Sequence, residues 1–316
     1  MIDKPLVSIG IPVYNGGRFI RKALDSLLAQ DYENLEFIIS DNASTDNTLQ
    51  LCKEYAIRDS RIRIHRHSHN LGSPKNFQTV LEHAQGEYFM WAAVDDYWLP
   101  EFVSVLVDDL NKHPAAGVAM CAVKRIREDG TLLDTIRFSG RTNPNSKSFL
   151  GMTLALDTPL KYNLFIYGIF RARLIKPAFP LQAELCGDRR FLSQFALAAR
   201  FAYVDSVLHI RVVHDKHYKD RYPLDDFINK HIAFSNSKQW FNSQPVLVVY
   251  RTLSSSEIIP WQRKLFIPVI LVSLFYKNLF WGLREMTKSF ILRFFPYSLQ
   301  KRLLRSIRES NDLQNT

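Results

Sequence analysis

Two adjacent carboxylates, Asp95 and Asp96, stand at the end of an apolar stretch, residues 88–94, that has the composition of a buried strand. Like charges at the edge of a core repel each other and lose hydration, so placing them there costs stability unless a cation offsets them. Oxygen ligands favour a hard divalent ion such as Mn²⁺ or Mg²⁺. The other interpretation is a solvated turn that caps the helix expected from about residue 100.

The other candidate groups of the first half also stand where an expected strand gives way to a helix. Pro12, Tyr14 and Asn15 follow the first strand, where Tyr14 offers a flat apolar face with a polar tip. Asp41 and Asn42 follow the second strand, and Asp41 could accept a hydrogen bond from a nucleobase N–H or a ribose hydroxyl. Turn formation and helix capping are the alternative roles for both groups.

A third loop contains Asn70, Gly72 and Lys75 before the next helix. Lys75 could approach a phosphate, although a lone lysine at a helix start is usually a solvated charge. The chain has neither the glycine-rich dinucleotide fingerprint nor the P-loop pattern, so it lacks their phosphate cradles. A nucleotide bound here would need a metal at its diphosphate, and the paired aspartates supply that site.

Strand and helix signals alternate through the first 123 residues, which predicts a doubly wound, mostly parallel α/β sheet with helices on both faces. In such sheets ligands bind beyond the carboxyl ends of the strands, where the candidate residues stand. The expected strands are 7–12, 35–40, 61–65, 88–94 and 117–123. Alternating histidines, His65, His67 and His69, could bind a metal on one strand face but fit a polar edge strand better.

Beyond residue 124 the rhythm loosens. Asp129 and Gly130 form a hairpin turn signal, residues 187–200 read as a helix, and residues 201–213 read as two short strands. From residue 223 onward the pattern is helical. We therefore expect a catalytic domain over 1–222, divided into a nucleotide-binding half (1–123) and an acceptor half (124–222), and a helical appendage over 223–316.

Composition and charge exclude several classes of protein. The 316 residues are 47% hydrophobic and 23% charged, as in a globular protein and not a disordered one. Three well-separated cysteines without C-x-x-C spacing argue against a disulfide framework and a zinc site. No apolar leader follows Met1, so a cytoplasmic location is the default expectation.

The net charge of +10 is concentrated near the C-terminus, where residues 261–308 contain ten Lys or Arg and one acidic residue. Residues 1–260 carry a net charge of only +3, so the predicted catalytic domain lacks the basic surface of a nucleic-acid-binding protein, and no nucleic-acid partner is expected. The uncharged run 265–276 is too short to span a bilayer. Basic helices with bulky apolar residues instead favour peripheral binding to an anionic membrane surface, with a helix packed on the domain as the alternative.

The segments 7–16, 40–46, 70–72 and 86–96, taken in this order, resemble family-2 glycosyltransferases of the GT-A fold. The resemblance is strong over about the first hundred residues. It continues more weakly through 187–191 and 211–214, so it covers about two thirds of the chain. Two positions depart from the family pattern: Ala93 stands where a further aspartate is common, and Gln78 stands where an asparagine is frequent.

The resemblance implies a nucleotide-diphosphate sugar donor, with a preference for UDP-sugars, and a divalent Mn²⁺ or Mg²⁺ cofactor. It assigns the catalytic base to Asp188, which otherwise reads as a helix N-terminal cap, with Glu184 as the fallback. The implied metal ligands are Asp96, Asp95 and His214, with Asp96 ligating directly and Asp95 shared with the ribose. The implied donor-binding residues are Pro12, Tyr14, Asn15, Asp41, Asn42, Asn70, Gly72, Lys75 and Asp95.

These features predict an inverting glycosyltransferase that acts on a glycan or lipid-linked acceptor in cell-surface polysaccharide synthesis. A non-catalytic sugar-nucleotide or glycan-binding module on the same fold is the alternative, since Ala93 removes one acid and fold alone does not settle function. A nucleotidyltransferase is the third reading, but residues 15–18 are a poor version of the glycine-rich basic loop it would need.

Overall fold

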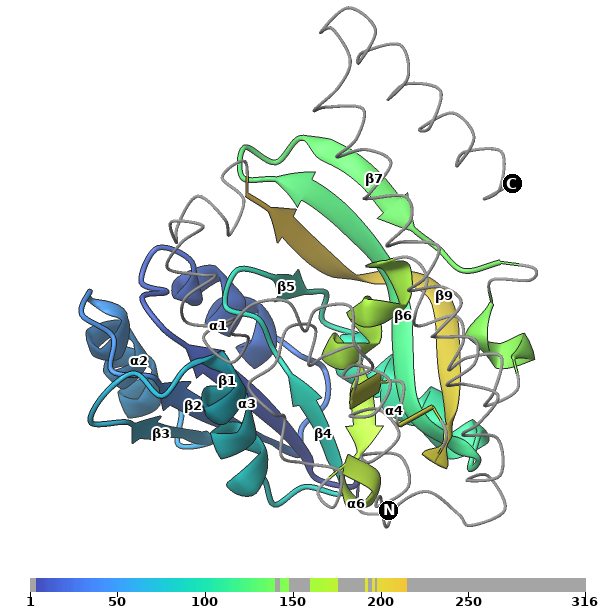
Figure 1. Ribbon diagram of the computed structural model, residues 1–316, viewed down its shortest axis with the longest axis horizontal. Helices are drawn as coiled ribbons and strands as arrows, with labels where there is room; N and C mark the ends of the chain where they lie inside the picture. The colour runs from blue at the N-terminus through green and yellow to red at the C-terminus, as the bar shows by residue number, and fades with distance from the viewer. Residues whose placement is uncertain are drawn as a thin grey trace, which may run out of the picture. The chain divides into compact units, whose positions relative to one another are not determined.

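The computed structural model describes residues 4–139, 143–147, 160–175, 191–192, 195–196 and 198–214, all within one compact unit of the chain. A single mixed sheet runs through this part in the order β3-β2-β1-β4-β8-β6-β9-β5, with β7 paired to β6 (Figure 1). The expected α/β class with a doubly wound sheet is confirmed. The proposed appendage, 223–316, lies outside the described residues.

The first four strands form a parallel half-sheet. They are β1 (Val7–Val13), β2 (Leu35–Asp41), β3 (Ile62–Arg66) and β4 (Tyr88–Trp91). Every residue of β1 and β2 is buried, as expected of parallel strands covered on both faces. β3 is an edge strand and is only partly buried, but it ends at Arg66, so of the three alternating histidines only His65 lies in the strand.

The second half of the sheet is mixed. Its strands are β5 (Tyr97–Trp98), β6 (Ala116–Arg127), β7 (Leu132–Ile136), β8 (Ile169–Arg171) and β9 (Arg200–Val213). β8 runs antiparallel to β4 and β6, β9 runs parallel to β6, and β5 pairs antiparallel with β9. The hairpin predicted at Asp129 and Gly130 joins β6 to β7, with Gly130 at φ +88°.

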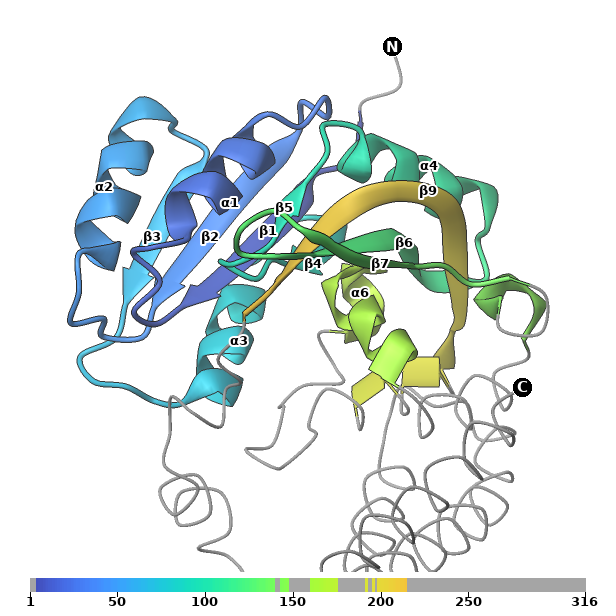
Figure 2. The ribbon, with the colours of Figure 1, turned by 90° about the horizontal axis from the view of Figure 1, so that it is seen from above.

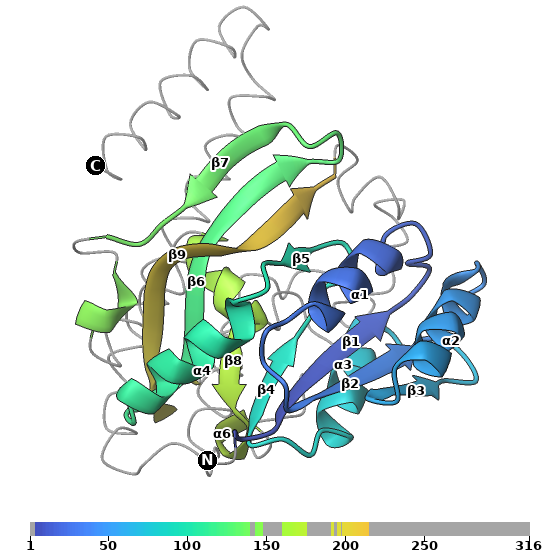
Figure 3. The same cartoon turned by 180° about the vertical axis from the view of Figure 1, so that it is seen from behind.

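The helices separate into two layers, one on each face of the sheet (Figure 2). The first layer, in front of the sheet in Figure 3, comprises α1 (Ile20–Leu28), α2 (Thr48–Arg58) and α4 (Phe102–Lys112). The opposite face is covered by α3 (Ser73–Glu82), α6 (Ala172–Ile175) and the 3₁₀ segment Leu160–Tyr167. A second 3₁₀ turn spans Pro144–Ser146. In the part of the chain that the structure describes, no helix has the length and apolar character needed to cross a membrane.

Two strand predictions need correction. β4 ends at Trp91, three residues before the predicted end, because the chain turns at Ala93, whose carbonyl accepts a hydrogen bond from the Asp96 N–H. Residues 200–213 form one strand where two were predicted. Register shifts opposite Cys121 and Ala122 bend this strand without interrupting it, and its curvature is plain in Figure 2.

Candidate active site

The loops that follow β1 and β2 are tied together by Asn15. Its backbone N–H donates to Ser44 Oγ at 3.0 Å, and its Oδ1 accepts from the Thr45 N–H at 2.9 Å. Asn15 has a φ of +51°, a left-handed conformation that asparagine tolerates better than most residues. The predicted donor-binding Asn15 is therefore engaged within the protein, where it fixes the loop that carries Tyr14.

Asn42 ties the second loop to the third in the same way. Its Nδ2 donates to Asn70 Oδ1 at 2.8 Å, and its Oδ1 accepts from the Leu71 N–H at 2.8 Å. Gly72 follows at a φ of +82°, which a side chain would strain. The structure thus brings the predicted residues Asn42, Asn70 and Gly72 together as parts of one loop clamp.

Asp41, at the end of β2, is fully buried and keeps one unsatisfied oxygen. Its Oδ1 accepts from the Ser44 N–H at 3.2 Å, whereas its Oδ2 accepts no hydrogen bond and lies 3.5 Å from Arg66 Nε. A buried carboxylate oxygen without a donor costs free energy unless a partner arrives. The Asp41 side chain therefore suits a ligand that supplies an N–H or O–H group.

The remaining donor-binding predictions lie in different settings. Pro12 is buried inside β1 opposite Ser40, and Tyr14 is partly exposed just beyond the strand. Lys75 lies on α3, where its ammonium is 3.5 Å from the Glu82 carboxylate and both side chains are exposed. Lys75 is thus an exposed charge with an exposed partner, and its contact with a phosphate stays a prediction.

The first loop packs closely against the turn that carries the paired aspartates. A Cβ added to Gly16 would lie 2.7 Å from Val13 Cγ2 and 3.2 Å from Val94 Cγ2, so a larger residue would push the two segments apart. The glycine thus allows the loop after β1 to approach Asp95. It joins the nucleotide half of the sheet to the acidic turn.

The two aspartates have opposite environments. The Asp96 side chain is 3% exposed, its Oδ2 lies 3.0 Å from His209 Nε2, and its Oδ1 accepts from the Val212 N–H at 3.1 Å. Both oxygens therefore fasten the turn to β9. Each Asp96 oxygen thus already accepts one hydrogen bond from β9, so direct ligation of a metal by Asp96, which stays a prediction, would use the remaining lone pairs.

Asp95 faces outward and meets His214. The Asp95 side chain is 37% exposed, and its Oδ2 lies 2.9 Å from His214 Nε2 at the end of β9. Restricted hydration and then the neighbouring Asp96 charge raise the pKa of the Asp95 carboxyl, although His214 counteracts the shift. A cation at this position would relieve the repulsion between the two carboxylates.

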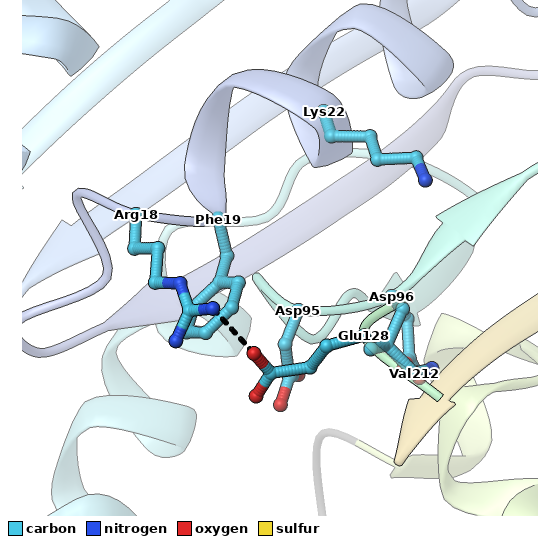
Figure 4. A pocket seen from close by; sticks show the side chains of 7 residues that line it. All are labelled: Arg18, Phe19, Lys22, Asp95, Asp96, Glu128 and Val212. Carbon is cyan, nitrogen blue, oxygen red and sulfur yellow. Dashed lines mark hydrogen bonds and ion pairs between the residues drawn. The ribbon is translucent and has the colours of Figure 1, made fainter. Parts of the chain in front are cut away.

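A pocket opens in front of these carboxylates. It is lined by Arg18, Phe19, Lys22, Asp95, Asp96, Glu128 and Val212 (Figure 4). Arg18, just before α1, forms an ion pair with Glu128 at the tip of the β6–β7 hairpin. The pocket thus combines elements from both halves of the sheet.

Asp95 and His214 fit a divalent ion that is shared with a substrate. In the described part of the chain, no three His, Cys, Asp or Glu side chains are grouped to hold a metal without outside help. Magnesium-like ions, however, commonly bind through one or two protein ligands while substrate phosphates and waters complete the shell. The convergence of Asp95 Oδ2 and His214 Nε2 matches that mode.

Replacing Asp96 with alanine is expected to destabilise the fold. The substitution leaves His209 and the Val212 N–H buried without their acceptor, which costs about 3 kcal/mol of unfolding free energy. Asp95→Ala, at the exposed member of the pair, should cost less than about 1 kcal/mol. Urea denaturation of both variants measures the difference, and equal losses would contradict a structural role for Asp96.

Several residues of the site were not predicted from the sequence: Arg18, Phe19, Lys22, Glu128, His209 and Val212. His209 carried a signal, because a polar residue between Leu208 and Ile210 interrupts an apolar strand pattern. Glu128 carried none, since the contact between a hairpin tip and a strand end 86 residues later depends on the fold. The predicted base Asp188 and its fallback Glu184 lie outside the described residues.

The sequence matches the family model described as Glycosyl transferase family 2 over residues 8–177. An uncharacterized glycosyltransferase of Rickettsia felis is 40% identical over 111 residues, which cover 34% of this chain and 18% of the relative. An uncharacterized protein of Mycobacterium tuberculosis is 42% identical over 120 residues, which cover 37% of this chain and 35% of the relative. The matches thus span only a minor part of these curated relatives.

Solved structures share the fold at low sequence identity. TarS 1–349 of S. aureus in complex with UDP-GlcNAc has a TM-score of 0.63 and 19% identity, and covers 92% of this chain and 76% of TarS. Its complex with UDP has a TM-score of 0.62 and 20% identity, over 94% and 78% of the two chains. A Pyrobaculum calidifontis mannosyltransferase in complex with GDP-Man and Mn²⁺ has a TM-score of 0.50 and 19% identity, over 88% and 76%.

These likenesses confirm the expected GT-A fold. More than half of the chain lies within the matched family model, and the matched range includes Asp41 and the Asp95 turn. The protein belongs to glycosyl transferase family 2.

Proposed function

We propose that this protein transfers a sugar from a nucleotide-diphosphate sugar to a glycan or lipid-linked acceptor in cell-surface polysaccharide synthesis, with inversion at the anomeric carbon. The observation that carries the proposal is the convergence of Asp95 and His214 at one edge of the sheet. Family membership supports the transferase activity.

The donor nucleotide is assigned to the loops after β1, β2 and β3. Asp41 offers a base N–H or a ribose hydroxyl a buried oxygen that accepts no hydrogen bond, and Tyr14 offers an exposed ring in the loop after β1. Asn15 and Asn42 hold these loops in register through their hydrogen bonds. The complexes of TarS with UDP and UDP-GlcNAc support a uridine nucleotide.

Asp95 and His214 would hold a divalent Mn²⁺ or Mg²⁺ ion, with the donor diphosphate completing its shell. When bound, such an ion neutralises charge that develops on the departing diphosphate. The mannosyltransferase complex with Mn²⁺ supports a divalent metal for this fold. Asp96 acts behind Asp95 by fixing the turn to β9.

Asp188 is the proposed general base. It takes the proton of an acceptor hydroxyl while that oxygen forms a bond to the anomeric carbon. The bond from this carbon to the diphosphate oxygen breaks, and the electron pair leaves with the nucleotide diphosphate. Attack from the face opposite the leaving group inverts the configuration.

A panel of nucleotide sugars tests the donor assignment. We expect a UDP-sugar to raise the melting temperature with Mn²⁺ and to do so much less in EDTA, because a ligand bound to the native state stabilises it. GDP- and CDP-sugars provide the matched comparison, and hydrolysis of the bound donor distinguishes a transferase from a non-catalytic binding module. No shift with any nucleotide sugar would contradict the proposal.

We further propose that the basic segment 261–308 keeps the enzyme at the cytoplasmic membrane face, where a lipid-linked acceptor lies. Each basic residue near an anionic surface contributes about 1 kcal/mol, and salt screens this attraction. The protein should float with anionic but not neutral liposomes, and truncation after Ser256 should abolish flotation. Equal binding to neutral liposomes, or binding to neither, would mean that the segment is a packed structural element.

A further inference from the structure

Glu128 connects two parts of the site that lie far apart in the sequence. It stands in the β6–β7 connection, and its Oε1 lies 2.5 Å from His214 Nδ1. Its Oε2 forms the ion pair with Arg18. One carboxylate therefore holds both the strand-end histidine and the segment that leads into α1 (Figure 4 shows the Arg18 contact).

The Glu128 contact determines which ring nitrogen of His214 can bind a metal ion. In a neutral histidine one ring nitrogen carries the proton, and the hydrogen bond at that nitrogen selects the tautomer. Glu128 is an acceptor at Nδ1, so it favours a proton on that nitrogen. Nε2 lies 2.9 Å from Asp95 Oδ2, and its lone pair becomes available when a divalent ion replaces the proton that these two atoms share. Metal-binding histidines are commonly oriented by such a carboxylate.

The ring of His214 is also confined by packing. The Phe19 ring lies 4.7 Å from it, measured between ring centroids, and the Arg18 guanidinium lies 5.2 Å from the Phe19 ring centroid. The His214 side chain is 14% exposed. Glu128, Phe19 and Asp95 thus contact the imidazole on different sides and limit its rotation.

We propose that Glu128 is a positioning residue that fixes the tautomer and orientation of His214 for a divalent ion, with Arg18 holding Glu128 in place. The inference rests on the proposed function, because it takes the ion to bind at Asp95 and His214. Glu128 itself contacts neither the ion nor the donor in this account.

The test compares Glu128→Gln with Glu54→Gln in the full chain. Glu54 is a matched control. Like Glu128, it forms an ion pair with an arginine, in this case Arg21 of α1, but it makes no contact with His214. Electron paramagnetic resonance of free Mn²⁺, measured with UDP present, gives the metal affinity. UDP affinity in EDTA and the melting temperature report any general structural damage.

We expect Glu128→Gln to weaken Mn²⁺ binding about 10- to 100-fold, while UDP affinity in EDTA and the melting temperature stay at wild-type values. Glu54→Gln should bind Mn²⁺ as the wild type does. An effect of Glu128→Gln no larger than that of Glu54→Gln overturns the positioning role. Wild-type protein that binds no Mn²⁺ with UDP would overturn the proposed metal site as well, and that failure is visible without any variant.

A spectroscopic signature tests the tautomer directly. In ¹⁵N-histidine-labelled protein with Mg²⁺ and UDP, His214 should show a proton on Nδ1 and none on Nε2, and a His214→Gln spectrum assigns the signal. At a Mg²⁺ concentration that half-saturates the wild type, Glu128→Gln should lose this signal, because weaker metal binding leaves His214 without the ion that removes the proton from Nε2. An unchanged His214 signal in Glu128→Gln would contradict the proposal.

Discussion

Replacing Asp95 with asparagine is expected to remove metal-dependent donor binding while the protein stays folded. The Asp95 carboxylate is the exposed member of the pair and lies 2.9 Å from His214 Nε2, so its loss removes the main anionic ligand. Losing only an outer partner of a metal site costs about 10- to 100-fold in affinity, so losing a ligand should cost about 100-fold or more. Titration of UDP with and without Mn²⁺ measures the effect.

Asp205→Asn is the matched control for this substitution. Asp205 also lies in an ion pair, with Arg137, but on an exposed part of β9 away from the pocket, where such pairs contribute little to stability. It should bind the donor like the wild type. Metal-dependent UDP binding that survives in Asp95→Asn would exclude Asp95 as a ligand.

Replacing Asp188 with asparagine is expected to lower turnover by about 100-fold or more and to leave donor affinity unchanged. Turnover falls because an amide cannot take the proton of the acceptor hydroxyl. Donor affinity stays the same because the substitution changes no group assigned to nucleotide binding. Steady-state transfer rates and UDP-sugar affinity, measured on the same preparation, separate the two effects.

Glu184→Gln is the control for the base assignment, because Glu184 is the other nearby carboxylate in the sequence. It should retain wild-type turnover. Full activity in Asp188→Asn would remove Asp188 from the mechanism, and loss of activity in Glu184→Gln alone would transfer the role of base to Glu184.

The parallel half of the fold was predictable because its signals are local. Buried strands such as β1 and β2 read as mostly apolar runs, and the polar groups that follow them mark the carboxyl edge of the sheet. The end of β4 and the continuity of β9 were not predictable. They depend on the turn at Ala93 and on register shifts against β6, which long-range pairing determines.

The sequence predicted several residues of the candidate site but not which contacts each of them makes. Spacing placed Asp95 and Asp96 side by side, but only the pairing of β5 with β9 brings His209 against Asp96 and leaves Asp95 facing the pocket. In the same way, Asn15 and Asn42 read as ligand-binding residues in the sequence and hold loops in the structure. Tertiary contacts decide which polar groups are already satisfied.

The most direct test of the account is calorimetric titration of UDP into the wild-type chain and Asp95→Asn, each with Mn²⁺ and with EDTA. We expect Mn²⁺ to tighten UDP binding at least about 10-fold in the wild type and to have no effect in Asp95→Asn. Equal UDP affinity with Mn²⁺ and with EDTA in the wild type would contradict a metal-assisted donor site at Asp95 and His214.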